Sequence, residues 1–107
     1  METFKKAEKF NLKDSVEYTA GAIVSKILTR NSAGNVTLFS FDKEQSLSEH
    51  TAPFDAIVQI VEGEAIITIN KEEFKLLQDE CIIMPANVPH TVFAKTKFKM
   101  LLTMIKG

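Results

Sequence analysis

Short segments rich in β-branched and aromatic residues, divided by turn residues, most restrict how this chain of 107 residues can fold. Val, Ile, Phe and Thr favour strands, and each segment has about the length of an ordinary strand. Turn compositions lie between them, as in NSAGN, DKEQS, EGE, NKEE and PANVP. The pattern predicts strands at residues 22–29, 36–41, 56–61, 65–69, 81–84, 90–94 and 98–105.

Strands at this regular spacing predict an all-β sandwich or barrel. A chain of 107 residues can bury one core with little surplus, so we expect residues 1–107 to form a single domain. The first twenty residues are less decided. The stretch NLKDSVEY either holds one helical turn or runs extended toward a partner, which predicts a short irregular N-terminal segment.

Composition removes several classes of partner. The formal net charge of -1 gives no general electrostatic reason to bind nucleic acid or an anionic membrane surface. No apolar run approaches the length of about 20 residues that a membrane-spanning helix needs. The single cysteine, Cys81, cannot form an internal disulfide, and the opening METFKKAEKF contains no apolar signal core. We therefore expect a cytoplasmic, reduced protein.

Several predicted strands are apolar on both faces. In AIVQIV, residues 56–61, alternate positions point to opposite sides, and Gln59 is the one polar residue of the segment. AIITI and MLLTMI repeat this pattern, so something must cover the second face. We expect a homodimer with sheet faces or edges packed together. The alternative is a closed monomeric barrel with a few exposed aliphatic side chains.

The chain contains two histidines, and their spacing to other residues resembles the two sequence motifs of the cupin superfamily. The first motif falls on Glu44, His50, Ala52, Ala56 and Gly63, of which His50 and Gly63 match. The second falls on Asp79, Pro85, Asn87, His90 and Ala94, of which Pro85 and His90 match. The resemblance implies a double-stranded β-helix, the jelly-roll barrel of the cupins, and places both histidines at ligand positions.

Three of the lost motif residues are glycines that serve turns with unusual backbone angles. Asp79 and Asn87 replace two of them, and these residue types tolerate left-handed conformations better than most. Gly63 keeps the hairpin after the first motif, and Pro85 stiffens the loop before His90. We therefore expect the geometry of the motifs to be retained.

The metal-binding chemistry is only half retained. Metal-binding cupins hold an Fe, Mn, Ni, Zn or similar divalent ion with three histidines and a glutamate, and the resemblance places Ala52 and Ala56 at two of those positions. His50 and His90 alone predict at most a weak metal site. Strand alternation directs Glu49 and Gln59 away from the barrel interior and leaves open where Asp55 points.

We expect His50 and His90 to face each other in the mouth of the barrel and to bind a small molecule there. The predicted cavity wall includes Phe93, Met100 and Met104, together with Phe98 and Leu102. Cys81 is interpreted as buried and unreactive. Alternation from Ala94 to Met100 places three lysines in water: Lys95, Lys97 and Lys99.

Three hypotheses for function follow. In the first, the protein binds a small, partly apolar molecule in the barrel, with His50 and His90 as polar anchors. In the second, it is an enzyme, either a metal-dependent dioxygenase or isomerase using the two histidines or a metal-free acid-base catalyst. In the third, it is a structural or regulatory subunit whose barrel serves dimerisation. The first is favoured, because no attached DNA-binding segment indicates regulation.

Overall fold

The computed structural model describes residues 4–106, and residues 1–3 and 107 of the expected single domain lie outside the described residues. Its elements are one short 3-10 helix followed by nine strands. These are η1 (Lys13–Ser15), β1 (Ile23–Asn31), β2 (Gly34–Phe41), β3 (Ser46–His50), β4 (Ala56–Glu62), β5 (Ala65–Ile69), β6 (Glu72–Leu76), β7 (Cys81–Met84), β8 (His90–Phe93) and β9 (Phe98–Ile105).

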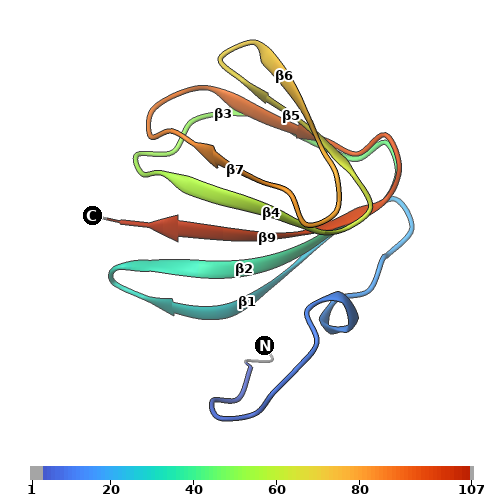
Figure 1. Cartoon of the computed structure of the whole chain (residues 1–107), viewed down its shortest axis with the longest axis vertical. Helices are drawn as coiled ribbons and strands as arrows, with labels where there is room; N and C mark the ends of the chain where they lie inside the picture. Colours follow the sequence, from blue (N-terminus) through green and yellow to red (C-terminus); the bar gives the residue numbers. More distant parts are fainter. Residues whose placement is uncertain (1–3, 107) are drawn as a thin grey trace.

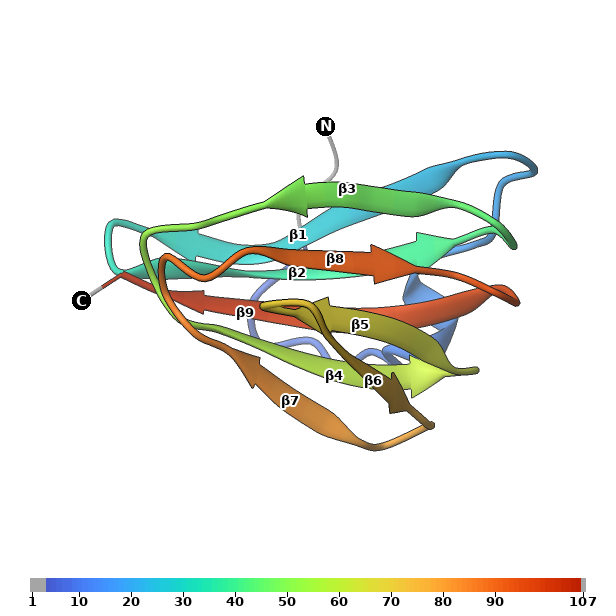
Figure 2. The same cartoon turned by 90° about the horizontal axis from the view of Figure 1, so that it is seen from above.

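The strands form two antiparallel sheets that face each other as a jelly-roll barrel, as the sequence predicted (Figures 1 and 2). The five-stranded sheet has the order β1-β2-β9-β4-β7, and the four-stranded sheet has the order β3-β8-β5-β6. Strands far apart in the sequence therefore lie side by side, as β2 and β9 do in Figure 1. No helix among residues 4–106 is long and apolar enough to cross a membrane.

Strand alternation builds the core between the two sheets. Ala56, Val58 and Ile60 of β4 are buried, and the intervening residues of that strand are half-buried. The rings of Phe41 and Phe98 stack with centroids 4.6 Å apart. Burial of such side chains is the main favourable contribution to folding, at about 25 cal/mol for each Å² of apolar surface removed from water.

Part of the second, outer face of the five-stranded sheet is covered by the chain's own N-terminal segment, residues 11–18. Val16 from this segment is only 1% exposed, and Ser40 of β2 donates a hydrogen bond from its Oγ to the carbonyl of Glu17. Leu38, on the same outer face as Ser40, is fully buried. The apolar pattern on both faces of β2 and β9 therefore has an explanation within one chain.

Lys99 corrects one prediction. It was expected in water, but it is only 8% exposed, because the N-terminal segment lies over it. Its Nζ donates to the carbonyl of Lys13 and lies 3.8 Å from a carboxylate oxygen of Glu62. Lys95 and Lys97 are exposed as expected.

The four glycine positions of the two motifs all have left-handed backbone angles. The φ angles are 68° at Glu44, 80° at Gly63, 71° at Asp79 and 63° at Asn87. A Cβ at Gly63 would lie 2.7 Å from the carbonyl oxygen of Lys97, so this position needs glycine for space as well as for conformation. The turn geometry is thus kept although three of the four glycines are absent.

Candidate functional site

The two histidines meet on adjacent strands of the four-stranded sheet. His50 at the end of β3 is the register partner of His90 at the start of β8. Their Nε2 atoms lie 3.1 Å apart, and the two rings meet edge to face with centroids 4.3 Å apart. Residues 40 positions apart in the sequence are thereby joined into one polar group.

Backbone carbonyls orient both rings. The Nδ1 of His50 lies 2.7 Å from the carbonyl oxygen of Ser48, and the Nδ1 of His90 lies 3.2 Å from that of Val88. A carbonyl only accepts, so each Nδ1 carries the proton that it donates. A neutral imidazole has one N–H, which leaves a lone pair on each Nε2. When both imidazoles are neutral, two lone pairs at this distance repel, so the Nε2 pair then suits a shared proton, a hydrogen-bond donor or a cation.

A cavity of about 90 Å³ lies beside the histidines, inside the barrel. A water molecule occupies roughly 30 Å³ of liquid, so the cavity has room for about three waters. Apart from the histidines its wall is apolar, and it includes Leu47, Val92 and Leu102. The arrangement therefore combines a small apolar space with one convergent pair of polar atoms.

The two histidines differ in their exposure to water. His90 is only 5% exposed, while His50 is exposed and lies at the mouth of the cavity. Burial lowers the pKa of His90 below its ordinary value of 6.5, and the neighbouring charge of His50 lowers it further. The hydrogen bond to Val88 opposes this shift. His90 is therefore neutral near pH 7 and able to accept a hydrogen bond or bind a cation at its Nε2.

The residues present do not fit the three-histidine, one-glutamate metal site. Ala52 and Ala56 line the cavity at the two substituted motif positions, and an alanine offers no donor atom. Asp55 is exposed, and its Oδ1 accepts a hydrogen bond of 2.9 Å from the backbone N–H of Ala86. Among residues 4–106, no group of three or more His, Cys, Asp or Glu side chains could hold a metal ion.

Glu49 and Gln59 also stay away from the cavity wall. Glu49 is exposed next to His50. Gln59 is the register partner of Cys81 and Leu101, on the opposite side of β4 from Val58 and Ile60. The alternation argument that directed both residues away from the interior agrees with these positions.

Three of the five predicted wall residues line the cavity and two do not. Met100, Leu102 and Met104 lie on it, whereas Phe98 is buried elsewhere in the core and Phe93 is 37% exposed and lies outside it. Placing Phe93 in the wall was wrong, because Val92 is 1% exposed and adjacent residues of a strand point to opposite faces. Met84 also lines the cavity and was missed. Its place follows from the pairing of Met84 on β7 with Ala56 on β4, which the sequence alone does not give.

Cys81 is exposed, so its interpretation as a buried residue was wrong. It begins β7, the edge strand of the five-stranded sheet, and it lies opposite Gln59. The outward parity of Gln59 therefore applies to the cysteine as well. The outer face of an edge strand can stay exposed to solvent even when the strand is apolar.

A second polar cluster lies outside the barrel, between the N-terminal segment and β9. We call it the Tyr18 cluster, and it consists of Tyr18, Glu62, Lys97 and Lys99. The Tyr18 hydroxyl donates a hydrogen bond of 2.6 Å to Glu62, and both lysine Nζ atoms lie within 5.0 Å of the Tyr18 ring centroid. Burial and the Glu62 carboxylate raise the pKa of Tyr18 above its ordinary value of 10.0. These contacts fasten the N-terminal segment to the barrel.

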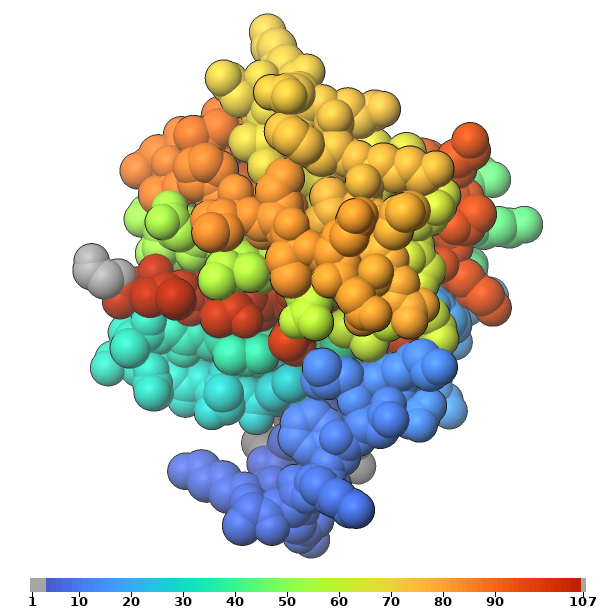
Figure 3. Space-filling model, viewed as in Figure 1, coloured from blue at the N-terminus to red at the C-terminus, as the bar shows by residue number. Residues whose placement is uncertain are grey.

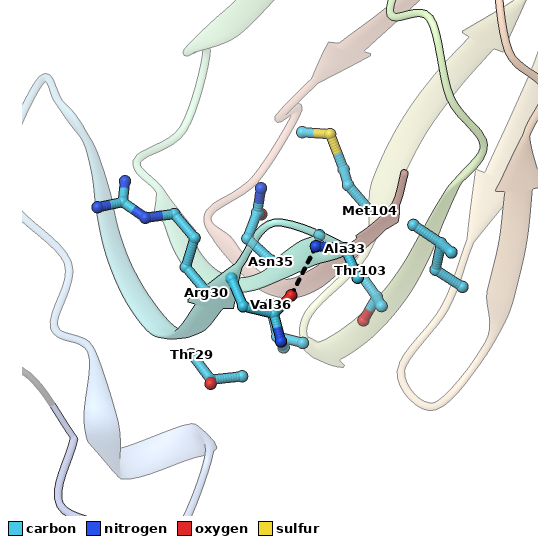
Figure 4. A pocket seen from close by; sticks show the side chains of 10 residues that line it. Thr29, Arg30, Ala33, Asn35, Val36, Thr103 and Met104 are labelled. Atoms are coloured by element: carbon cyan, nitrogen blue, oxygen red, sulfur yellow. Dashed lines mark hydrogen bonds between the residues drawn. The ribbon is translucent and has the colours of Figure 1, made fainter. Parts of the chain in front are cut away.

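A shallow hollow at the tip of the β1–β2 hairpin belongs to the turn (Figure 4). The backbone N–H of Ala33 donates a hydrogen bond of 2.7 Å to Oδ1 of Asn31, which closes the turn. A Cβ at Gly34 would clash with the carbonyl oxygen of Met104, so the hairpin packs tightly on β9. This hollow brings together no pair of groups comparable to the two histidines.

With the barrel and its histidines established, comparison with known proteins identifies the family. Residues 37–106 match the family of cupin domains, and the chain belongs to the cupin superfamily. It is 33% identical to a conserved protein of unknown function from Streptococcus pyogenes, with a TM-score of 0.91 over 100% of this chain and 96% of that chain. Among curated proteins, none matches the sequence.

Two further structures show how widely this fold occurs. A cupin 2 conserved barrel domain protein from Leptotrichia buccalis is 41% identical, with a TM-score of 0.88 over 91% of this chain and 47% of that chain. A salicylate 1,2-dioxygenase from Pseudaminobacter salicylatoxidans is 15% identical, with a TM-score of 0.73 over 80% of this chain and 27% of that chain. At that identity, the likeness to the dioxygenase concerns the fold alone.

Proposed function

We propose that this cupin binds a small, partly apolar molecule in its barrel, with His50 and His90 as the polar anchors. The observation that carries the proposal is the convergence of the two Nε2 atoms, 3.1 Å apart, beside an otherwise apolar cavity. Converging polar groups in an apolar space are typical of small-molecule sites. The exposed ring of His50 gives the ligand access from solvent, and the buried ring of His90 holds its inner end.

The cavity restricts the size and chemistry of the ligand. A volume of about 90 Å³ admits roughly three to five non-hydrogen atoms, judged from the space that a water molecule takes. Neutral imidazoles accept hydrogen bonds at Nε2, so the ligand needs an O–H or N–H donor at one end. The methionine, leucine and valine side chains of the wall favour a short hydrocarbon at the other end. Short alcohols and amines meet both conditions.

The test is a titration of metal-free protein with C2 to C4 alcohols, amines and carboxylates, followed through the ring resonances of the two histidines by NMR. We expect saturable shifts with an alcohol or amine, and loss of those shifts in His50→Ala and His90→Ala. Phe93→Ala is the matched control, because Phe93 follows on the same strand outside the cavity. Equal binding by the wild type and both histidine variants would refute the anchoring role.

A metal-dependent enzyme, of the dioxygenase or isomerase type, is the second candidate. One observation favours it, because metal-bound histidines also fix their second ring nitrogen on a carbonyl and point the other inward. Catalytic metal sites normally keep three protein ligands, and here the wall supplies two imidazoles. Near-stoichiometric Fe, Mn, Ni or Zn in untagged protein, lost in both histidine variants, would favour the enzyme. Absence of bound metal after supplementation with these ions would exclude the metal-dependent enzyme.

We also propose a homodimer formed through the outer face of β4, β7 and the end of β9. Ile83 is 59% exposed and Ile105 is 57% exposed, and strand parity places both on this face with the half-buried Ile57. Exposed aliphatic side chains gathered on one sheet face often mark an interface. Sedimentation equilibrium at micromolar concentration tests this, with Ile83→Lys expected to shift a dimer toward monomer. A wild-type mass equal to one chain would contradict the proposal.

A further inference from the structure

Methionine is concentrated around the histidines. The sequence contains four methionines, and Met84, Met100 and Met104 all line the cavity of about 90 Å³ that holds His50 and His90. They come from two different strands, β7 and β9. A thioether sulfur can ligate a soft metal ion, so the cavity wall holds three sulfur atoms capable of ligation besides the two imidazoles.

The sheet register places two of these methionines on either side of Ala56. Ala56 pairs with Met84 across β4 and β7, and with Met104 across β4 and β9. Directly paired residues have Cβ atoms roughly 4.5–5.5 Å apart, so both side chains start within reach of the space above Ala56. Ala56 is the motif position at which the resemblance places a glutamate. Two thioether side chains therefore flank the position at which metal-binding cupins carry the glutamate carboxylate.

The donors around this cavity are soft or borderline, and all are uncharged. The part of the wall formed by described residues contains no Asp, Glu or Cys side chain. A divalent ion would bring two positive charges into an apolar space without a balancing anion, which costs much more than one charge does. Thioether and imidazole ligands together favour monovalent copper over the harder divalent ions.

We propose that the cavity binds Cu(I), with the Nε2 atoms of His50 and His90 and the sulfurs of Met84 and Met104 as its ligands. The proposal shares the histidine pair with the small-molecule function, but it adds the thioethers as ligands. In the alternative, the methionines only fill the core, as flexible apolar side chains commonly do.

The copper test is an anaerobic titration of untagged apo-protein with Cu(I), in competition with the chromophoric chelator bicinchoninate. We expect one Cu(I) per chain, and binding at least about tenfold weaker in the Met84→Leu, Met104→Leu double variant. Ile82→Leu is the matched control, since Ile82 lies on β7 with Met84 and packs against the core but does not line the cavity. The His50→Ala, His90→Ala double variant should no longer compete with bicinchoninate for Cu(I). Leucine keeps side-chain volume, and thermal unfolding of each variant checks that it folds.

X-ray absorption at the copper edge supplies a second readout, with both nitrogen and sulfur neighbours expected in the wild type and nitrogen alone in the double variant. Cu(I) affinity unchanged by the double variant, or a spectrum without sulfur, would overturn the proposal. So would tighter binding of Zn(II) than of Cu(I) under the same conditions. Failure of the small-molecule function is seen separately, in the metal-free NMR titration.

Discussion

Two polar clusters within residues 4–106, the histidine pair and the Tyr18 cluster, differ in how their polar atoms are satisfied. In the Tyr18 cluster the phenol, the carboxylate and the Lys99 ammonium are paired with one another or with the backbone. In the histidine pair each Nδ1 contacts a backbone carbonyl, and the two Nε2 atoms lie 3.1 Å apart beside the cavity. The first cluster holds the fold together, and the second offers unused bonding capacity next to a cavity.

The largest effect should come from adding a third imidazole to the cavity. Ala52 lines the cavity and is only partly exposed, so Ala52→His would bring the protein ligands to the three found in catalytic zinc sites. We expect Zn(II) affinity to rise by roughly 100-fold or more, beyond what an outer-shell group contributes. Isothermal titration calorimetry measures the change. Glu49→His is the control, since Glu49 is exposed and lies outside the wall; an equal gain there would show that the cavity is irrelevant.

The next largest effect should come from removing the Lys99 charge from the Tyr18 cluster. Lys99→Met keeps the length of the side chain but removes the ion pair with Glu62 and the hydrogen bond to the Lys13 carbonyl. We expect the free energy of unfolding to fall by about 2 kcal/mol, since a buried interaction is lost while Glu62 stays partly exposed to water. Urea unfolding measures this loss. Lys97→Met should change stability little, because Lys97 is exposed. Small-molecule binding in the barrel should remain.

The contribution of each cluster to stability should also depend on pH. That of the histidine pair should change at acid pH. The pKa of His90 is lowered on folding, so below 6.5 the unfolded chain binds more protons than the folded one. Stability of the metal-free protein should therefore fall as the pH drops below 6.5, by at most about 1.4 kcal/mol per pH unit for one group. Thermal unfolding between pH 7 and pH 5 tests this. In His90→Asn the slope should be shallower, and an unchanged slope would assign the effect to other groups.

The smallest expected effect is the loss of the Tyr18 contribution to stability at alkaline pH. The pKa of Tyr18 is raised on folding, so the neutral phenol stabilises the folded protein below pH 10.0 and that contribution is lost as the pH rises above this value. Tyr18→Phe removes the hydrogen bond to Glu62 and should cost about 1 kcal/mol at pH 7. Its stability should also fall less between pH 9 and pH 11 than that of the wild type, measured by urea unfolding. A parallel decline in both proteins would contradict the argument.

Sequence reasoning predicted the strands whose own residues favour them. The ranges 65–69, 81–84 and 98–105 agree with β5, β7 and β9, because each carries a run of aliphatic or aromatic side chains. β3 and β6 were missed, and residues 42–46 and 70–73 were read as turns although strands begin at Ser46 and Glu72. Both strands lie at the edges of the four-stranded sheet and are mostly polar. Pairing with β8 and β5 defines them more than local propensity does.

Motif spacing located the two histidines, but it could not give the rest of the site. His50 and His90 were placed opposite each other because the cupin motifs fix where their strands run. The part played by Met84 depends on the pairing of β7 with β4, which a single sequence does not reveal. The burial of Lys99 depends on a segment more than 80 residues earlier in the chain. Strand alternation gives the face of a side chain, and only tertiary structure gives what covers that face.

The N-terminal segment covers one part of the outer face of the five-stranded sheet and leaves another part exposed. In Figure 3 its residues, in blue, lie against the lower side of the barrel and project beyond it. Val16 is buried over β2 and the start of β9, while Ile83 on β7 and Ile105 at the end of β9 remain exposed. A second chain approaching this sheet would therefore meet a ready surface on one side and a steric barrier on the other. In the homodimer that we propose, the segment would therefore direct a partner to the uncovered side of the sheet.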